Sequence, residues 1–197
     1  MSRTLCLKIL YVIILALLGI IVYWIISNTS EEHRFITSLF IALFLLIPGR
    51  VNQYFYQDFY RGRKYLDKDD LDKALYYFLK FEHCIEEKPW KKNILWMTWS
   101  FSIYTIDILA MVKNNISTVY IRKEQYEEAE KYINDALNID GKYPLPYFNL
   151  SIINMVNGKK EECMNNIEKS RKLGMNNSKV DKFIRNMQSM YADSQSV

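Results

Sequence analysis

The sequence predicts an all-α protein in two parts: a transmembrane helical hairpin over residues 1–50, and an α-solenoid of about three helical repeats with a capping helix over residues 51–197. Three observations predict it. Two apolar runs near the N-terminus contain no charged residue. A pattern of small and large residues recurs with the regular period of a helical-repeat protein. Gly and Pro number only 6 and 4, which disfavours a turn-rich β protein and a disordered chain.

The first apolar run extends without interruption from Ile9 to Ile26. A helix of that length covers about 27 Å, close to the thickness of the hydrocarbon layer. Tyr11, Tyr23 and Trp24 lie near its ends, where amphipathic rings favour the interface. The alternative is a cleaved signal peptide, but its apolar core is shorter and ends in a small-x-small site. We therefore expect an uncleaved anchor.

The second apolar run, Phe35–Ile47, is shorter than the first and is closed by Pro48-Gly49. Its length alone is short for a span, although the flanking arginines would extend it by snorkelling to the two interfaces. The alternative is a re-entrant or interfacial helix. Because the link Ser27–Arg34 is short and polar, we expect a membrane-crossing hairpin.

The charge distribution predicts topology. Residues 1–64 hold seven Lys/Arg against three Asp/Glu, and the remaining residues hold 19 of each. The excess therefore flanks the apolar runs, which argues against a nucleic-acid-binding face. The positive-inside bias places both termini and the repeat domain in the cytoplasm, and makes this a multi-pass protein of the cell membrane.

No residue pattern predicts catalysis, a cofactor or a metal. Cys6, Cys84 and Cys163 are far apart and form no ligand spacing. His33 lies in the predicted external loop, and His83 precedes Cys84 on a predicted helix, where adjacent residues do not face each other. No glycine-rich phosphate loop, HExxH or GxSxG occurs, so we expect no enzyme.

The repeat consists of small and large apolar residues at fixed spacing. Ala129, Ile133 and Ala136 recur as Cys163, Ile167 and Ser170 after one period of about 34 residues. An upstream copy has Gly62, Tyr65, Ala74 and Phe78 at the spacing of Ser117, Tyr120, Ala129 and Ile133. Small residues let paired helices approach closely, and large ones fill the space between neighbouring pairs. Each copy is therefore predicted to be a helical hairpin.

These motifs, above all LDKALYYF (71–78) and YEEAEKYINDALNIDGKYP (126–144), resemble the tetratricopeptide repeat (TPR) family over roughly residues 52–175. The abundance of Tyr, Ile, Asn and Lys is typical of an AT-rich bacterial genome, so the resemblance is to a membrane-anchored bacterial type. The alternative is a chance amphipathic bundle. A polar-backed helix over Ser178–Tyr191 is predicted to cap the solenoid.

The sequence departs from the family pattern in an insert around residues 89–105. The separation of Ala74 from Ala129 exceeds one period by more than half a period. The apolar run Ile94–Val112 has the hydropathy of a third membrane span, but a span there would separate stacking repeats. We therefore expect an elongated or extra helix on the solenoid; a position at the membrane interface is a further alternative, because tryptophans favour it. The insert's tryptophans are Trp90, Trp96 and Trp99.

The resemblance implies protein–protein contact through a concave groove lined by the first helix of each repeat. It implies that amides such as Asn115 and Asn149 hydrogen-bond the backbone of a bound peptide; the alternative is that they cap or solvate helices. We expect a membrane-tethered scaffold for a protein or peptide that carries an apolar segment and an acidic group. The alternatives are an assembly or quality-control factor for membrane proteins, or a peptide-responsive regulatory module. The predicted groove residues are Phe59, Arg63, Met111, Asn114, Asn115, Thr118, Arg122, Phe148, Asn149, Ile152 and Val156.

Overall fold

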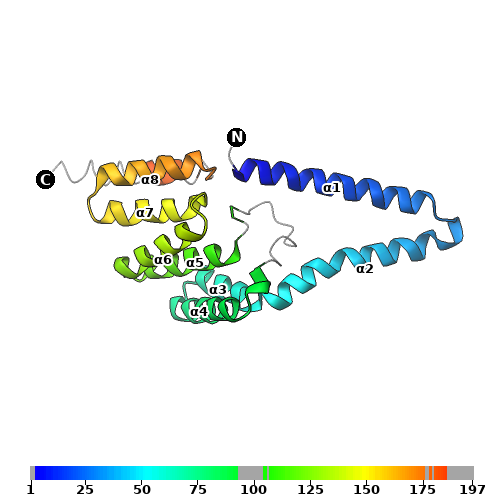
Figure 1. The fold of residues 1–197 in the computed structure, drawn as a ribbon, viewed down its shortest axis with the longest axis horizontal. Coiled ribbons are helices and arrows are strands. Elements are labelled where there is room, and N and C mark those ends of the chain that lie inside the picture. The colour runs from blue at the N-terminus through cyan, green and yellow to red at the C-terminus, as the bar shows by residue number, and fades with distance from the viewer. Residues whose placement is uncertain (1–2, 93–103, 106, 176–177, 179, 186–197) are drawn as a thin grey trace.

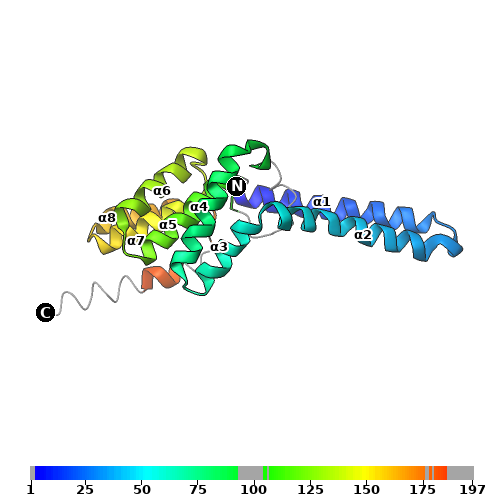
Figure 2. The ribbon, with the colours of Figure 1, turned by 90° about the horizontal axis from the view of Figure 1, so that it is seen from below.

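The described part of the chain consists of helices and the segments that join them and contains no β-strand, as predicted. The computed structural model describes residues 3–92, 104–105, 107–175, 178 and 180–185. Figures 1 and 2 show a long hairpin that projects away from a stack of shorter helices. The helices are α1 (Arg3–Ser27), α2 (Glu31–Phe55), α3 (Gln57–Asp67), α4 (Leu71–Glu87), α5 (Ile108–Arg122), α6 (Tyr126–Ile139), α7 (Pro144–Val156) and α8 (Lys160–Lys172).

The hairpin α1–α2 exposes apolar side chains along its whole length, among them Trp24 and Phe40. Two segments, Ile9–Ser27 and Glu31–Phe55, are long and apolar enough to cross a membrane, with mean hydropathies of 2.9 and 1.8. The apolar run ends at Pro48-Gly49, but helix α2 continues through both residues to Phe55. The second helix therefore has 25 residues, and Arg34 and Arg50 flank its uncharged middle part.

Three successive helix pairs form the repeat: α3 packs on α4, α5 on α6, and α7 on α8. Neighbouring pairs are joined by contacts of α4 with α5 and of α6 with α7, so the pairs stack in chain order (Figure 1). Asp70 caps α4 by accepting a hydrogen bond from the Lys73 amide at 3.3 Å, and Asp107 caps α5 by accepting from two amides. These caps fix where two of the helices begin.

The turn inside each hairpin has the same backbone geometry. Asp69, Glu124 and Gly158 adopt φ of 61°, 59° and 70° at equivalent positions. The residue after each turn donates its amide to a carbonyl five residues earlier, as Gln125 does to Tyr120 at 2.9 Å. A left-handed residue at this place is a common way to end a helix. The shared turn shows that the three hairpins are copies of one structural unit.

Close approach between paired helices occurs where the small residues were predicted. A Cβ on Gly62 would lie 2.6 Å from the ring of Phe78, which is fully buried. Ala74, Ala129 and Cys163, the equivalent small residues of the second helices, are also fully buried. Stacked tyrosines fill the same place in the first two hairpins, and their centroid distances are similar. The pairs are Tyr65–Tyr77 at 5.5 Å and Tyr120–Tyr132 at 5.6 Å.

The insert and the cap are described only in part. Trp96 and Trp99 lie outside the described residues, so the elongated or extra helix expected for most of the run Ile94–Val112 stays a prediction. The last residues of this run, from Ile108 on, belong to α5 and are mostly buried in the core. Helix follows α8 at residues 180–185, where Val180 is fully buried and Phe183 packs on the last hairpin. A terminal helix therefore does cover the end of the stack.

The repeated turn makes a testable difference between two glycines. Gly158→Ala should lower the free energy of unfolding by roughly 1–2 kcal/mol, because φ is positive and no neighbouring atom lies within 4 Å to add a steric effect. Gly141→Ala is the control, since its nearest atom is the Leu137 carbonyl oxygen at 3.5 Å and its φ is not in the left-handed region. Equal melting temperatures for the two variants would contradict the shared turn.

Candidate protein-binding surface

The first helices of the three hairpins form one face of the stack, since α5 contacts both α3 and α7. The predicted groove residues divide by burial on this face. Phe59, Asn114 and Asn149 are buried; Met111, Asn115, Thr118, Phe148 and Ile152 are half-buried; Arg63, Arg122 and Val156 are exposed. Phe59 packs in the core against Phe78 and Phe81 rather than on the surface.

Asn149 lies in a buried polar cluster that joins α7 to α5. Its acceptors are Asn114 Oδ1 at 3.1 Å, Ser117 Oγ at 3.2 Å and Thr118 Oγ1 at 3.1 Å. A buried amide that already donates inside the fold stabilises the contact between helices, because leaving it unpaired costs free energy. Asn115, at the equivalent place in the preceding repeat, is half-buried instead. The two asparagines therefore have different surroundings despite their shared register.

The two predicted arginines also differ. Arg122 donates from Nη1 to the Leu66 carbonyl oxygen at 2.9 Å and to Asp69 at 3.3 Å, so it caps the C-terminal end of α3. Arg63 is exposed on α3. Burial raises the pKa of Tyr143 well above its usual range, and the positive charge of Arg63 opposes that rise. Arg63 therefore lies within electrostatic range of the start of α7.

Part of the third hairpin is covered by the chain itself. The ring of Phe148 contacts that of Phe183 edge-on, with centroids 5.2 Å apart. Arg171 on α8 pairs with Asp181 at 2.6 Å and holds the same terminal helix. The terminal helix therefore covers part of the predicted groove at the third hairpin. Val156, which is 50% exposed at the end of α7, is the most accessible apolar residue of the predicted groove.

What remains open on this face is a set of hydrogen-bond donors and apolar side chains. Arg63 offers a cation, Asn115 an amide, and Ile152 and Val156 apolar surface. Among the described residues no group of three His, Cys, Asp or Glu side chains could hold a metal ion. The face can bind an extended or helical segment by combining apolar contact with one charge-assisted hydrogen bond.

A charged cluster that sequence analysis missed joins the first two hairpins. Lys113 Nζ lies 2.7 Å from Glu82 Oε1 and 3.2 Å from Asp135 Oδ2. Burial lowers the pKa of Lys113, but hydrogen bonds and charges of the two carboxylates outweigh burial and raise it. The lysine also lies 5.5 Å from the Tyr132 ring centroid. The partners are 22 and 31 residues away, so no local spacing could have revealed them.

An aromatic cluster lies where α2 enters the repeat. Trp90 contacts Phe55 edge-on at 5.3 Å, and Tyr54 contacts the same ring at 5.2 Å. Lys91, beside Trp90, accepts a hydrogen bond at its carbonyl oxygen from Tyr56 at 2.7 Å. The start of the insert is therefore attached to the end of the long hairpin.

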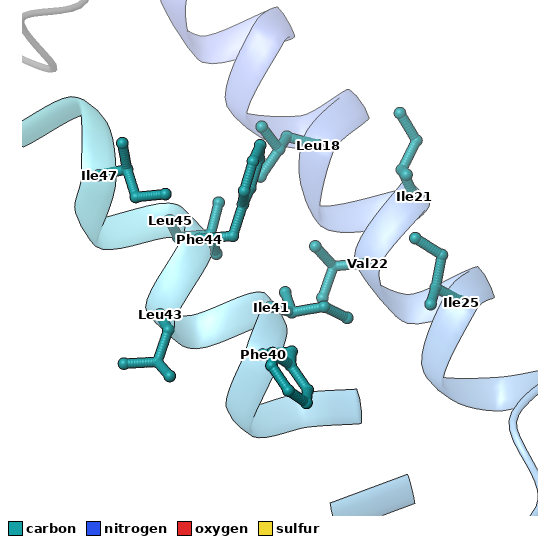
Figure 3. Close-up of a pocket in the computed structure, with 10 residues that line it drawn as sticks. All are labelled: Leu18, Ile21, Val22, Ile25, Phe40, Ile41, Leu43, Phe44, Leu45 and Ile47. Carbon is teal, nitrogen blue, oxygen red and sulfur yellow. The ribbon is translucent and has the colours of Figure 1, made fainter. Parts of the chain in front are cut away.

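An open apolar hollow lies between the two helices of the long hairpin. Figure 1 shows α1 and α2 diverging from the loop that joins them, and Figure 3 shows Val22 and Ile41 pointing toward one another across the gap. The hollow measures about 690 Å³ and has almost no polar surface. Its other lining residues are Leu18, Ile21, Ile25, Phe40, Leu43, Phe44, Leu45 and Ile47.

Breaking the charged cluster should lower the stability of the fold far more than breaking a surface ion pair does. Lys113→Ala leaves Glu82, whose side chain is 11% exposed, without its cation and should cost about 3 kcal/mol of stability. Lys123→Ala is the matched control: its partner Asp72 is 88% exposed, so the loss should stay below about 1 kcal/mol. Urea unfolding of both variants measures the difference, and equal midpoints would show that the cluster is not a structural link.

Comparison of the chain with known proteins identifies a similar solved structure but no matching family. No protein-family model and no curated protein matches the chain. Among solved structures the chain is similar to the "First TPR of Spaghetti (RPAP3) bound to HSP90 peptide SRMEEVD", with a TM-score of 0.48 and 20% identity. The similarity covers 67% of this chain and 88% of that one. At this identity no residue's role can be transferred from one chain to the other.

Proposed function

We propose that this protein is a membrane-tethered adaptor, in which α1 and α2 cross the cell membrane and the TPR-like repeat binds a protein partner at the cytoplasmic face. The main support is the direct fusion of an apolar hairpin, whose candidate spans bury no residue, to a stack of helical hairpins. Solenoids of this kind form extended binding surfaces from their first helices. No catalytic step is part of the proposal.

The exposed apolar surface of the hairpin supports the tether. Large side chains such as Trp24 and Phe44 are 65% and 69% exposed. A contiguous apolar surface of this extent is unfavourable in water and favourable in lipid. Glu31 and Glu32 begin α2, whereas Arg50 lies near its other end. That order fits a cytoplasmic repeat domain under the positive-inside bias.

Topology can be tested by labelling two introduced cysteines on intact cells. In a chain with Cys6, Cys84 and Cys163 replaced by Ala, Ser30→Cys should react with an impermeant thiol reagent, whereas Lys131→Cys on α6 should react only after the cells are opened. Both sites are exposed, so access rather than burial decides the result. Labelling of position 131 but not position 30 on intact cells would reverse the topology.

The partner is expected to be a protein segment with apolar side chains and an acidic group. Val156 and Ile152 offer apolar contact on α7, and Arg63 offers a guanidinium that suits a carboxylate. Phe148 and Arg122 are less suitable for testing this idea than the exposed residues, because each makes contacts that hold the fold together. Variants at the exposed positions separate binding from stability.

Binding can be measured as the recovery of co-purifying protein from detergent-solubilised membranes. The double variant Arg63→Gln/Val156→Ser should recover about tenfold less of the main partner, equivalent to a loss of about 1.4 kcal/mol, with an unchanged melting temperature. The control is Tyr76→Gln/Met164→Ser, which changes exposed residues of the second helices α4 and α8. Equal recovery by the two variants would exclude the first-helix face as the binding surface.

A second candidate function is assembly or quality control of membrane proteins, favoured by the apolar hollow between α1 and α2. Another apolar helix could pack there through small and branched side chains. The same purification separates the two candidates. An adaptor should recover one dominant partner, whereas an assembly factor should recover many membrane proteins, and their recovery should fall with Val22→Phe and not with Val156→Ser.

A further inference from the structure

A second hollow, lined mainly by residues with polar or charged side chains, lies where α2 passes into α3. It measures about 500 Å³. Its lining residues are Gly49, Gln53, Gln57, Tyr60, Arg61 and Lys64. Apart from the adjacent pair Tyr60 and Arg61, they recur every three or four residues, so they share one face of the chain as it leaves the apolar hairpin. No acidic side chain is among them.

The hollow depends on the break between the two helices. Gly49 and Lys64 would lie about 22 Å apart on one straight helix, a length over which a single helix face is convex. Tyr56 interrupts the helix with φ −110° and ψ 24°, and α3 begins directly after it. Tyr56 is fully buried and its ring contacts Phe81 at 5.4 Å, so the break is fixed by packing.

The hollow has positive charge. Lys64 forms no ion pair with any described residue. Arg61 lies 3.6 Å from Asp58, but that carboxylate is shared with Lys80 at 3.0 Å, and the hydrogen bond to Asp58 raises the pKa of Lys80. One carboxylate thus faces two cations, and a net positive charge is left beside Lys64. An anion in the hollow would meet both Arg61 and Lys64.

The remaining lining groups include two neutral hydrogen-bond donors and a glycine. Gln53 and Gln57 are exposed and can each donate two amide hydrogens, which suits phosphate oxygens. Gly49 has no side chain, and apart from its chain neighbours and the nearby backbone of its own helix no atom lies within 4 Å of where its Cβ would be. The end of the hollow nearest the apolar hairpin is therefore open.

We propose that this hollow binds the phosphate headgroup of an anionic phospholipid. The choice of a lipid over a soluble phosphate rests on position, and so on the proposed membrane tether. Gly49 comes two residues after the apolar run that ends at Ile47, which places the open end at the depth of the headgroups if α2 crosses the membrane. The cations of α3 then reach the phosphate from the cytoplasmic side.

The test compares lipids that differ only in charge. The full chain, purified in a neutral detergent, is melted with phosphatidylglycerol, with phosphatidylcholine of the same acyl chains, or with inorganic phosphate. Phosphatidylglycerol at ten times its Kd should raise the melting temperature by roughly 3–6 °C above the other two, and salt should reduce the gain. An equal gain with phosphatidylcholine, or with inorganic phosphate, would overturn the proposal.

Two different variants should abolish the gain. Arg61→Gln/Lys64→Gln removes two charges, and Gly49→Leu fills the open end without changing charge. The control Lys131→Gln/Lys159→Gln removes two charges from exposed positions of the later repeats and should keep the gain. A gain retained by both hollow variants, or lost equally in the control, would refute the site.

Failure of the tether is a separate result. Alkaline carbonate should leave a membrane-crossing chain in the pellet, and its release would refute the proposed function. A chain that stays in the membrane but is stabilised equally by charged and neutral lipids would refute only the headgroup site.

Discussion

The close approach of paired helices is the constraint on which the repeat depends. At Gly62 the backbone of α3 comes so near the ring of Phe78 that no side chain fits between them. Ser117 and Ser151, the small residues at the positions equivalent to Gly62 in the next two hairpins, are fully buried. This spacing sets where the first helices lie, and therefore where a binding face can form. The shared left-handed turn at the end of each first helix then repeats the geometry along the chain.

Polar groups fix the register between hairpins, and they use some of the same residues that could contact a partner. Asn149 joins α7 to α5 through buried hydrogen bonds, and Arg122 caps α3 from α5. Lys113 joins the first two hairpins through Glu82 and Asp135. A buried amide or cation that is paired inside the fold is costly to redirect outward. The accessible part of the face is thus smaller than the first-helix pattern alone implies.

The fold was largely predictable because its main signals are local. The regular spacing of Ala129 and Cys163 predicts two buried contacts, and both residues are buried. The end of the apolar run at Pro48 did not reveal where α2 ends, since a proline inside a helix removes one hydrogen bond yet need not end the helix. The site was less predictable. Whether Asn149 is buried, or Phe148 is covered by Phe183, depends on contacts between distant residues that no spacing in one sequence reveals.

The single-residue junction at Tyr56 has a mechanical consequence. Because α3 begins directly after Tyr56, and Tyr56 is buried and hydrogen-bonded to the Lys91 carbonyl oxygen, the repeat cannot swing as it would on a flexible linker. In a tethered chain the repeat would be held at one height and one angle above the lipid. A partner anchored in the same bilayer would then meet the binding face at a high effective concentration only if its binding segment projects to that height. The distance of that segment from the bilayer would therefore select partners as strictly as its side chains do.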